Sequence, residues 1–153
     1  MKSKILCILL AMFLALSCSQ QTKTAKAILD EAENIVEQYP DSAFRLLNTV
    51  YFPEDLSKKQ YNRYVLLMMQ AKDKSYRDIT ADTVIFAAKA YYEKKNDAPN
   101  AAMAAYYCGR ILHEQKKAEE AAEAYLEALQ WADKTDDYNL KGLIHGNLGS
   151  RSL

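Results

Sequence analysis

The sequence predicts an all-α protein built from pairs of antiparallel helices. Apolar residues recur at three- and four-residue steps in successive segments, which is the periodicity of helices with one buried face. Only four glycines and three prolines occur among 153 residues, so few points interrupt these segments. No segment shows the alternation of a half-buried strand. Short polar turns separate the helical segments, and this favours antiparallel neighbours.

The first helices are predicted from Ala25 onward. The pattern breaks at Tyr39-Pro40-Asp41, because proline disfavours helix at the residue before it, and Asp41 or Ser42 is the expected cap of the next helix. That second helix is short. Ser57 is the predicted cap of a third helix, over about Lys58 to Asp73. The residues expected to be buried in the first two helices are Ala25, Ile28, Leu29, Ala32, Ile35, Val36, Ala43, Leu46, Leu47 and Val50.

Four further helices are expected in the second half of the chain. A fourth follows candidate caps between Asp78 and Asp82 and includes Val84 to Tyr92. Asn96 to Asn100, which contains Pro99, is predicted to be a turn. The remaining helices are predicted over Ala101 to Gln115, Ala118 to Asp133, and from Tyr138 onward.

One helix pair carries a specific pattern of small and large residues. Gly109 is followed after twelve residues by Ala121, then by Tyr125, Ala128 and Leu129. A glycine inside a helix costs about 1 kcal/mol relative to alanine, so a close approach between helices is expected there. These residues resemble the tetratricopeptide repeat family. The earlier pairs match less well: Ala43 and Ala87 are placed at the positions of Ala121, and Leu47 and Tyr91 at those of Tyr125, with spacings of 44 and 34 residues.

The resemblance implies a right-handed superhelical stack over residues 25–149, whose first helices line a concave surface. On that surface the family would present Met103, Tyr106, Arg110 and His113 to a protein or peptide partner. Tyrosine and arginine are favoured anchors in such recognition. The alternative is that Tyr106 and Met103 simply pack between repeats. The adjacent pairs Tyr91-Tyr92 and Tyr106-Tyr107 are each expected to turn one ring to the core and one to a surface.

The N-terminal residues form a separate unit. Lys2 and Lys4 precede an apolar run from Ile5 to Leu16, which has the length of a secretory signal and is too short to span a bilayer. The run ends in Leu14-Ala15-Leu16-Ser17-Cys18, which resembles the lipobox of bacterial lipoproteins apart from Ala15. That resemblance implies a signal peptide over 1–17, a lipidated Cys18, and a tether over 18–24. The alternative is an ordinary signal peptide with an incidental cysteine.

The resemblance also implies a place in the bacterial cell envelope. Because Ser19 stands where some lipoproteins carry a retaining Asp, the outer membrane is favoured. Without Lys2 and Lys4 the 20 basic residues become 18 against 20 acidic ones, a net charge of −2. A chain of this charge without a basic stripe is a poor nucleic-acid binder.

Signals for catalysis are nearly absent. His113 and His145 fall on different helices without a second ligand at metal spacing, and Cys108 is expected to be a buried apolar residue. We therefore expect no enzyme activity, cofactor, metal or small-molecule substrate. A non-catalytic interaction scaffold is the favoured function.

The last helix is expected to lack a partner. Residues 150–153 would be a truncated tail, and Ile144 and Leu148 would be left without a covering helix, unless the last helix itself serves as the cap. This expectation supports a second hypothesis, in which the chain is the sensory half of a longer envelope-anchored regulator whose output region is missing.

Overall fold

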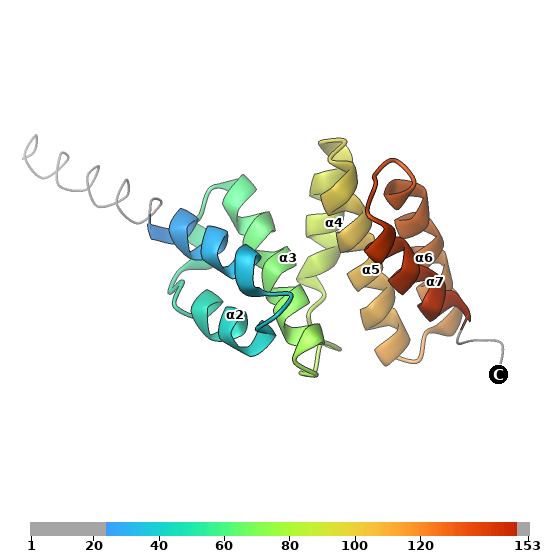
Figure 1. Ribbon diagram of the computed structural model, residues 1–153, viewed down its shortest axis with the longest axis horizontal. Coiled ribbons are helices and arrows are strands. Elements are labelled where there is room, and N and C mark those ends of the chain that lie inside the picture. The colour runs from blue at the N-terminus through green and yellow to red at the C-terminus, as the bar shows by residue number, and fades with distance from the viewer. Residues whose placement is uncertain (1–23, 150–153) are drawn as a thin grey trace, which may run out of the picture.

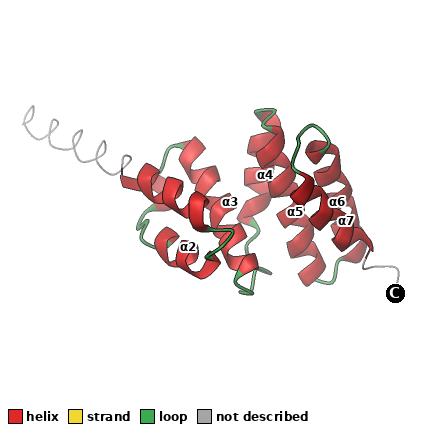
Figure 2. Ribbon diagram, in the orientation of Figure 1, coloured by secondary structure: helices red, strands yellow, loops and turns green. Residues whose placement is uncertain are grey.

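The computed structural model describes residues 24–149, and within that range every regular element is a helix (Figures 1 and 2). The predicted all-α class is therefore confirmed. The first α-helix covers residues 24–35. The others are α2 (Pro40–Leu47), α3 (Lys58–Lys74), α4 (Val84–Lys94), α5 (Ala98–Glu114), α6 (Ala118–Ala132) and α7 (Tyr138–Gly149), and a short 3-10 helix, η1, spans Pro53–Asp55.

The helices pack in chain order along the long axis of the molecule (Figure 1). Each helix from α2 to α7 contacts the next one, and α3 also contacts α5. The helix over 24–35 is joined to α3 by the Arg63 guanidinium, which donates to the carboxylate of Asp30 at 2.7 Å and to that of Glu33. Segments 30 to 33 residues apart therefore lie side by side.

Two clusters of buried apolar residues hold the helices together. The smaller one joins the helix over 24–35, α2 and α3 through seven buried residues, among them Leu29, Leu47 and Leu67. The larger one contains twenty-three buried residues from α3 to α7. Tyr64 of α3 packs against both clusters. The helix α3 thus connects two cores of unequal size.

The ends of α3, α4 and α5 share one backbone conformation. The residues Tyr76, Asn96 and Lys116 have φ angles of 56°, 54° and 63°. The next amide in each case donates back to a carbonyl five residues earlier, as Asp97 does to Tyr92 at 3.1 Å and Lys117 to Leu112 at 2.9 Å. This left-handed closure satisfies carbonyls at the helix end and reverses the chain in three residues before α5 and α6.

Helix starts differ from the prediction at three places. The helix α5 begins at Ala98, so Pro99 lies in its first turn instead of in a loop, where its missing N–H is not needed. The helix α2 begins at Pro40 after Tyr39, and neither Asp41 nor Ser42 is its cap. The Asp78 carboxylate binds the amide and hydroxyl of Thr80 within the loop before α4. The predicted cap Ser57 is confirmed, since its hydroxyl oxygen accepts from the Gln60 amide.

The register of the second helix pair is displaced by one residue from the prediction. Ala88 and Tyr92 are buried, at 1% and 5% exposure, whereas Ala87 is exposed and Tyr91 is half-buried. The spacing to the buried Ala121 and Tyr125 is therefore 33 residues. The alignment on Ala87 and Tyr91 was wrong because the adjacent Ala-Ala and Tyr-Tyr pairs allow either register.

The expectation that Ile144 and Leu148 of α7 would be left uncovered was also wrong. Ile144 is fully buried within the larger cluster, and Leu148 is partly buried against it. The exposed apolar residues of this helix are Tyr138 and Leu143. The helix α7 packs against α6, and Asn147 of α7 also reaches Tyr106 of α5.

Candidate binding surface

Residues from four distant segments line one hollow of about 280 Å³, here named the central hollow. Its apolar part comprises Met103 and Tyr107 of α5 and Leu140 and Leu143 of α7. Leu143 is 47% exposed. The polar lining comprises Glu37, Gln70, Lys74, Asp137 and Asn139. The sequence pattern did not single out these polar residues, because they share a surface only after α3, α5 and α7 have packed.

Hydrogen bonds order one wall of the central hollow. The Glu37 carboxylate accepts from the Gln70 amide at 2.5 Å and from the Lys74 ammonium at 2.9 Å. These contacts join the turn after the first helix to α3. The hollow thus offers an apolar patch beside a polar wall in which Glu37 and Lys74 are paired with each other, an arrangement suited to an apolar side chain flanked by main-chain hydrogen-bonding groups.

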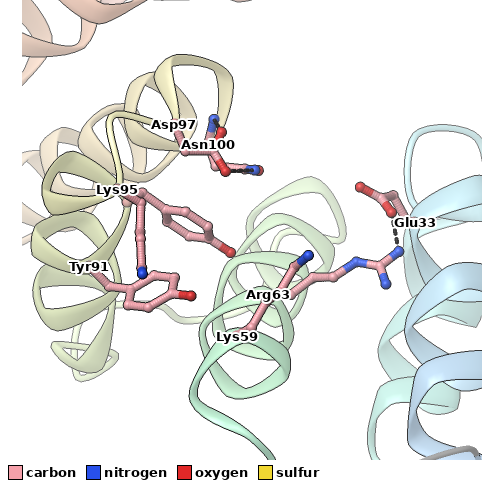
Figure 3. Close-up of a pocket in the computed structure, with 8 residues that line it drawn as sticks. Glu33, Lys59, Arg63, Tyr91, Lys95, Asp97 and Asn100 are labelled. Atoms are coloured by element: carbon pink, nitrogen blue, oxygen red, sulfur yellow. Dashed lines mark hydrogen bonds and ion pairs between the residues drawn. The ribbon is translucent and has the colours of Figure 1, made fainter.

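A second hollow of about 360 Å³, here named the edge hollow, lies where the turn between α4 and α5 faces α3 (Figure 3). Its walls carry Lys59 and Arg63 of α3, Tyr91 and Tyr92 of α4, and Lys95 in the turn. Glu33, Asp97 and Asn100 complete it. Asp97 caps α5, and its carboxylate accepts from the side chain and the amide of Asn100 at 2.9 and 3.4 Å.

The structure separates residues that were predicted to form one groove on α5. Met103 lines the central hollow, whereas Arg110 lines a third hollow of about 420 Å³ beside Tyr76 and Glu114. His113 is half-buried one helical turn after Arg110, and Tyr106 is only 5% exposed. The packing alternative therefore describes Tyr106, and the division of Tyr106-Tyr107 into one inner and one outer ring was wrong.

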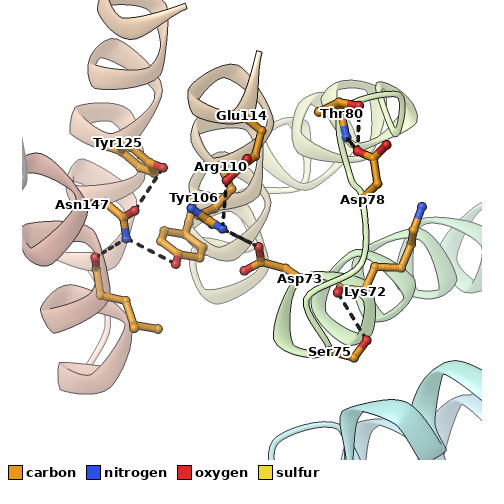
Figure 4. Close-up of polar contacts among 11 residues, drawn as sticks. Lys72, Asp73, Ser75, Asp78, Thr80, Tyr106, Arg110, Glu114, Tyr125 and Asn147 are labelled. Atoms are coloured by element: carbon orange, nitrogen blue, oxygen red, sulfur yellow. Dashed lines mark hydrogen bonds and ion pairs between the residues drawn. The ribbon is translucent and has the colours of Figure 1, made fainter. Parts of the chain in front are cut away.

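Arg110 ties α5 to α3 (Figure 4). Its Nε and Nη2 atoms donate to Asp73 Oδ1 at 3.1 and 2.9 Å, and Nη2 also lies 3.5 Å from Glu114. Burial alone would lower the pKa of Arg110, but the hydrogen bond and charge of Asp73 raise it further above its usual range. Most of the guanidinium's donor capacity is thus used within the protein, and its role here is to hold two helices together.

Tyr106, Tyr125 and Asn147 connect α5, α6 and α7 (Figure 4). The Tyr125 hydroxyl donates to Asn147 Oδ1 at 3.4 Å, and Asn147 Nδ2 donates to the Tyr106 hydroxyl at 3.5 Å. The Tyr125 ring also lies against Gly109, and Ala121 and Ala128 are fully buried beside it in the larger cluster. The residues of the repeat pattern therefore meet at the α5–α6 contact.

The free cysteine of the described residues is poorly placed to react. The Cys108 side chain is 1% exposed, and burial raises the pKa of its thiol to about 12. The described residues contain no group of three or more His, Cys, Asp or Glu side chains arranged to hold a metal ion. In the same part of the chain no helix combines the length and hydropathy that a bilayer crossing needs. The predicted lipidation residue, Cys18, lies outside the described residues.

Comparisons of the chain with protein-family models, with curated proteins and with solved structures find no match.

Proposed function

We propose that this chain is a non-catalytic interaction scaffold, a tetratricopeptide-like stack of antiparallel helix pairs that binds a peptide or a segment of a protein partner. Three features support the stack: helices that contact in chain order, the 33-residue spacing of Ala88–Tyr92 and Ala121–Tyr125, and identical turns after α4 and α5. In such a stack the first helices of successive pairs share one face.

The central hollow is the observation that carries this proposal. Four segments contribute to it, and they are the turn after the first helix, α3, α5 and the start of α7. The exposed part of Leu143 and the half-buried Met103 offer apolar contact, and methionine adapts its shape to different partners. A partner with one apolar side chain on an extended backbone would fit this combination of apolar patch and polar wall.

Crosslinking in whole cells tests the scaffold. A photoreactive residue at Met103 should capture a discrete partner, whereas the same residue at the exposed Glu120 of α6 should not. The captured partner should then bind the purified chain, and Met103→Glu should weaken that binding roughly tenfold or more, since it places a charge against apolar surface. Equal capture at both positions, or full binding by Met103→Glu, would overturn the proposal.

The proposal includes a lipid anchor at Cys18 in the bacterial envelope, with the outer membrane favoured. Acyl chains stabilise membrane binding by about 0.8 kcal/mol for each buried methylene, so several chains give a firm attachment. Palmitate labelling should mark the parent chain and fail with Cys18→Ala, which should also leave the membrane fraction. Labelling of Cys18→Ala at the parental level would reject the anchor without affecting the scaffold.

A further inference from the structure

The edge hollow contains a tyrosine hydroxyl that no described residue binds. Tyr92 is 5% exposed and lines the hollow, yet within residues 24–149 its hydroxyl has no hydrogen-bond partner. Burial raises the pKa of Tyr92, so the hydroxyl keeps its proton at neutral pH. The hydroxyl oxygen is not among the described side-chain atoms that are buried without a partner, so it reaches the hollow and can donate to an acceptor bound there.

The lining of the edge hollow carries one positive charge in excess, since three cations, Lys59, Arg63 and Lys95, face two carboxylates. Arg63 is paired with Asp30 and Glu33, whereas the Asp97 carboxylate accepts from the neutral Asn100 side chain and keeps its negative charge near Tyr92. Lys59 and Lys95 form no ion pair with any described residue, and both belong to walls of the same hollow (Figure 3). Two ammonium groups and one phenolic donor are therefore available to a single bound group.

We propose that the edge hollow binds a compact oxyanion, a carboxylate or a phosphate, to which the Tyr92 hydroxyl donates while Lys59 and Lys95 supply positive charge. The contribution of each lysine is moderate, because both side chains are exposed at the rim and are screened by salt. The tyrosine supplies the directional part of the recognition, since hydrogen bonds to charged groups are stronger than those between neutral ones. The inference does not depend on the proposed scaffold function.

Titration of the full chain with inorganic phosphate tests the site, at constant ionic strength and with chloride as the competing anion. We expect saturable binding at one site. Tyr92→Phe should weaken it roughly tenfold, and the double variant Lys59→Ala/Lys95→Ala should weaken it by a similar factor. The matched control Lys94→Ala/Lys116→Ala changes the net charge equally, uses exposed lysines outside the hollow, and should bind like the parent.

A second measurement separates a binding role of Tyr92 from a structural one. Because its hydroxyl has no protein partner, Tyr92→Phe should melt at or above the temperature of the parent without phosphate. Saturating phosphate should raise the melting temperature of the parent more than that of the variant. The assignment of Tyr92 would be overturned if Tyr92→Phe melted at a lower temperature than the parent without phosphate, and if phosphate raised the melting temperatures of both proteins equally.

The source of the oxyanion is resolved by a parallel titration with a triglutamate peptide and its triglutamine analogue. Tighter binding of triglutamate than of phosphate, with no binding of triglutamine, identifies a carboxylate-bearing segment. Binding of phosphate alone identifies a free phosphate or a phosphorylated small molecule. Failure of both phosphate and triglutamate, or equal binding by the double lysine variant and its control, would refute the site.

Discussion

At the scale of single residues, the contact between Gly109 and Tyr125 sets the distance between α5 and α6. A Cβ atom built on Gly109 would lie 2.5 and 2.6 Å from two carbon atoms of the Tyr125 ring, too close for any real contact. The ring is 1% exposed and has little room to move. The close approach predicted for Gly109 thus involves an aromatic ring and not a second small residue.

Gly109→Ala should lower the free energy of unfolding by up to about 2 kcal/mol. Overpacking costs about 1–3 kcal/mol, and the better helix propensity of alanine returns about 1 kcal/mol. Gly146→Ala in α7 is the matched control, because a Cβ there meets nothing within 4 Å. The control should gain up to about 1 kcal/mol. Denaturant unfolding measures the free energy of unfolding of both variants. An equal increase for Gly109→Ala and Gly146→Ala would show that the approach at Gly109 is not tight.

At the scale of elements, the left-handed residues after α3, α4 and α5 decide where each helix ends. Asparagine tolerates this conformation better than other non-glycine residues, because its short polar side chain bonds locally. Asn96 therefore suits its position, whereas Lys116, with a φ angle of 63°, is strained. The sequence predicted these turns by length and polarity but not their shared geometry, since a lysine carries no signal for a positive φ.

Lys116→Gly should raise the free energy of unfolding by about 0.5–1 kcal/mol, because glycine adopts a positive φ without steric cost. The gain is limited by the greater backbone freedom of glycine in the unfolded chain. Asn96→Gly is the comparison, and it should raise the free energy of unfolding by less than Lys116→Gly does. Thermal unfolding with calorimetry measures both. A larger gain at position 96 than at position 116 would contradict this account of the turns.

At the scale of the whole molecule, the buried tyrosines lie on α4, α5 and α6. Burial raises the pKa of Tyr125 to about 12, although the charge of Arg110 acts in the opposite direction. Burial also holds the pKa of Tyr107 well above 10.0, and those of Tyr64 and Tyr106 are raised for the same reason. The folded state therefore favours neutral phenols from α3 to α6.

Stability should fall steeply at alkaline pH. A folded pKa above the unfolded value means that the stabilising contribution is complete below pH 10, the ordinary tyrosine value, and is lost as pH rises toward about 12. We expect a loss of at least about 2 kcal/mol across this window. Denaturant titrations at several pH values measure it. Tyr125→Phe should show a smaller decline, and a flat profile above pH 10 would contradict the burial of these phenols.

The prediction was most accurate where neighbouring residues decide the outcome. The helix predicted over about Lys58 to Asp73 spans Lys58–Lys74, and its cap Ser57 was identified from the sequence. The prediction failed where two adjacent residues of the same type could each be the buried one, as with Ala87 and Ala88. It also failed where burial depends on distant helices, as with Tyr106, which Asn147 reaches from 41 residues away.

The sequence by itself determined that the chain is helical and approximately where each helix lies, because backbone hydrogen bonds, caps and apolar periods act within a few residues. Tertiary structure alone decided which faces meet, which tyrosines lose contact with water, and which side chains gather around the central and edge hollows. Those outcomes depend on contacts between segments more than thirty residues apart, and no local pattern specifies them.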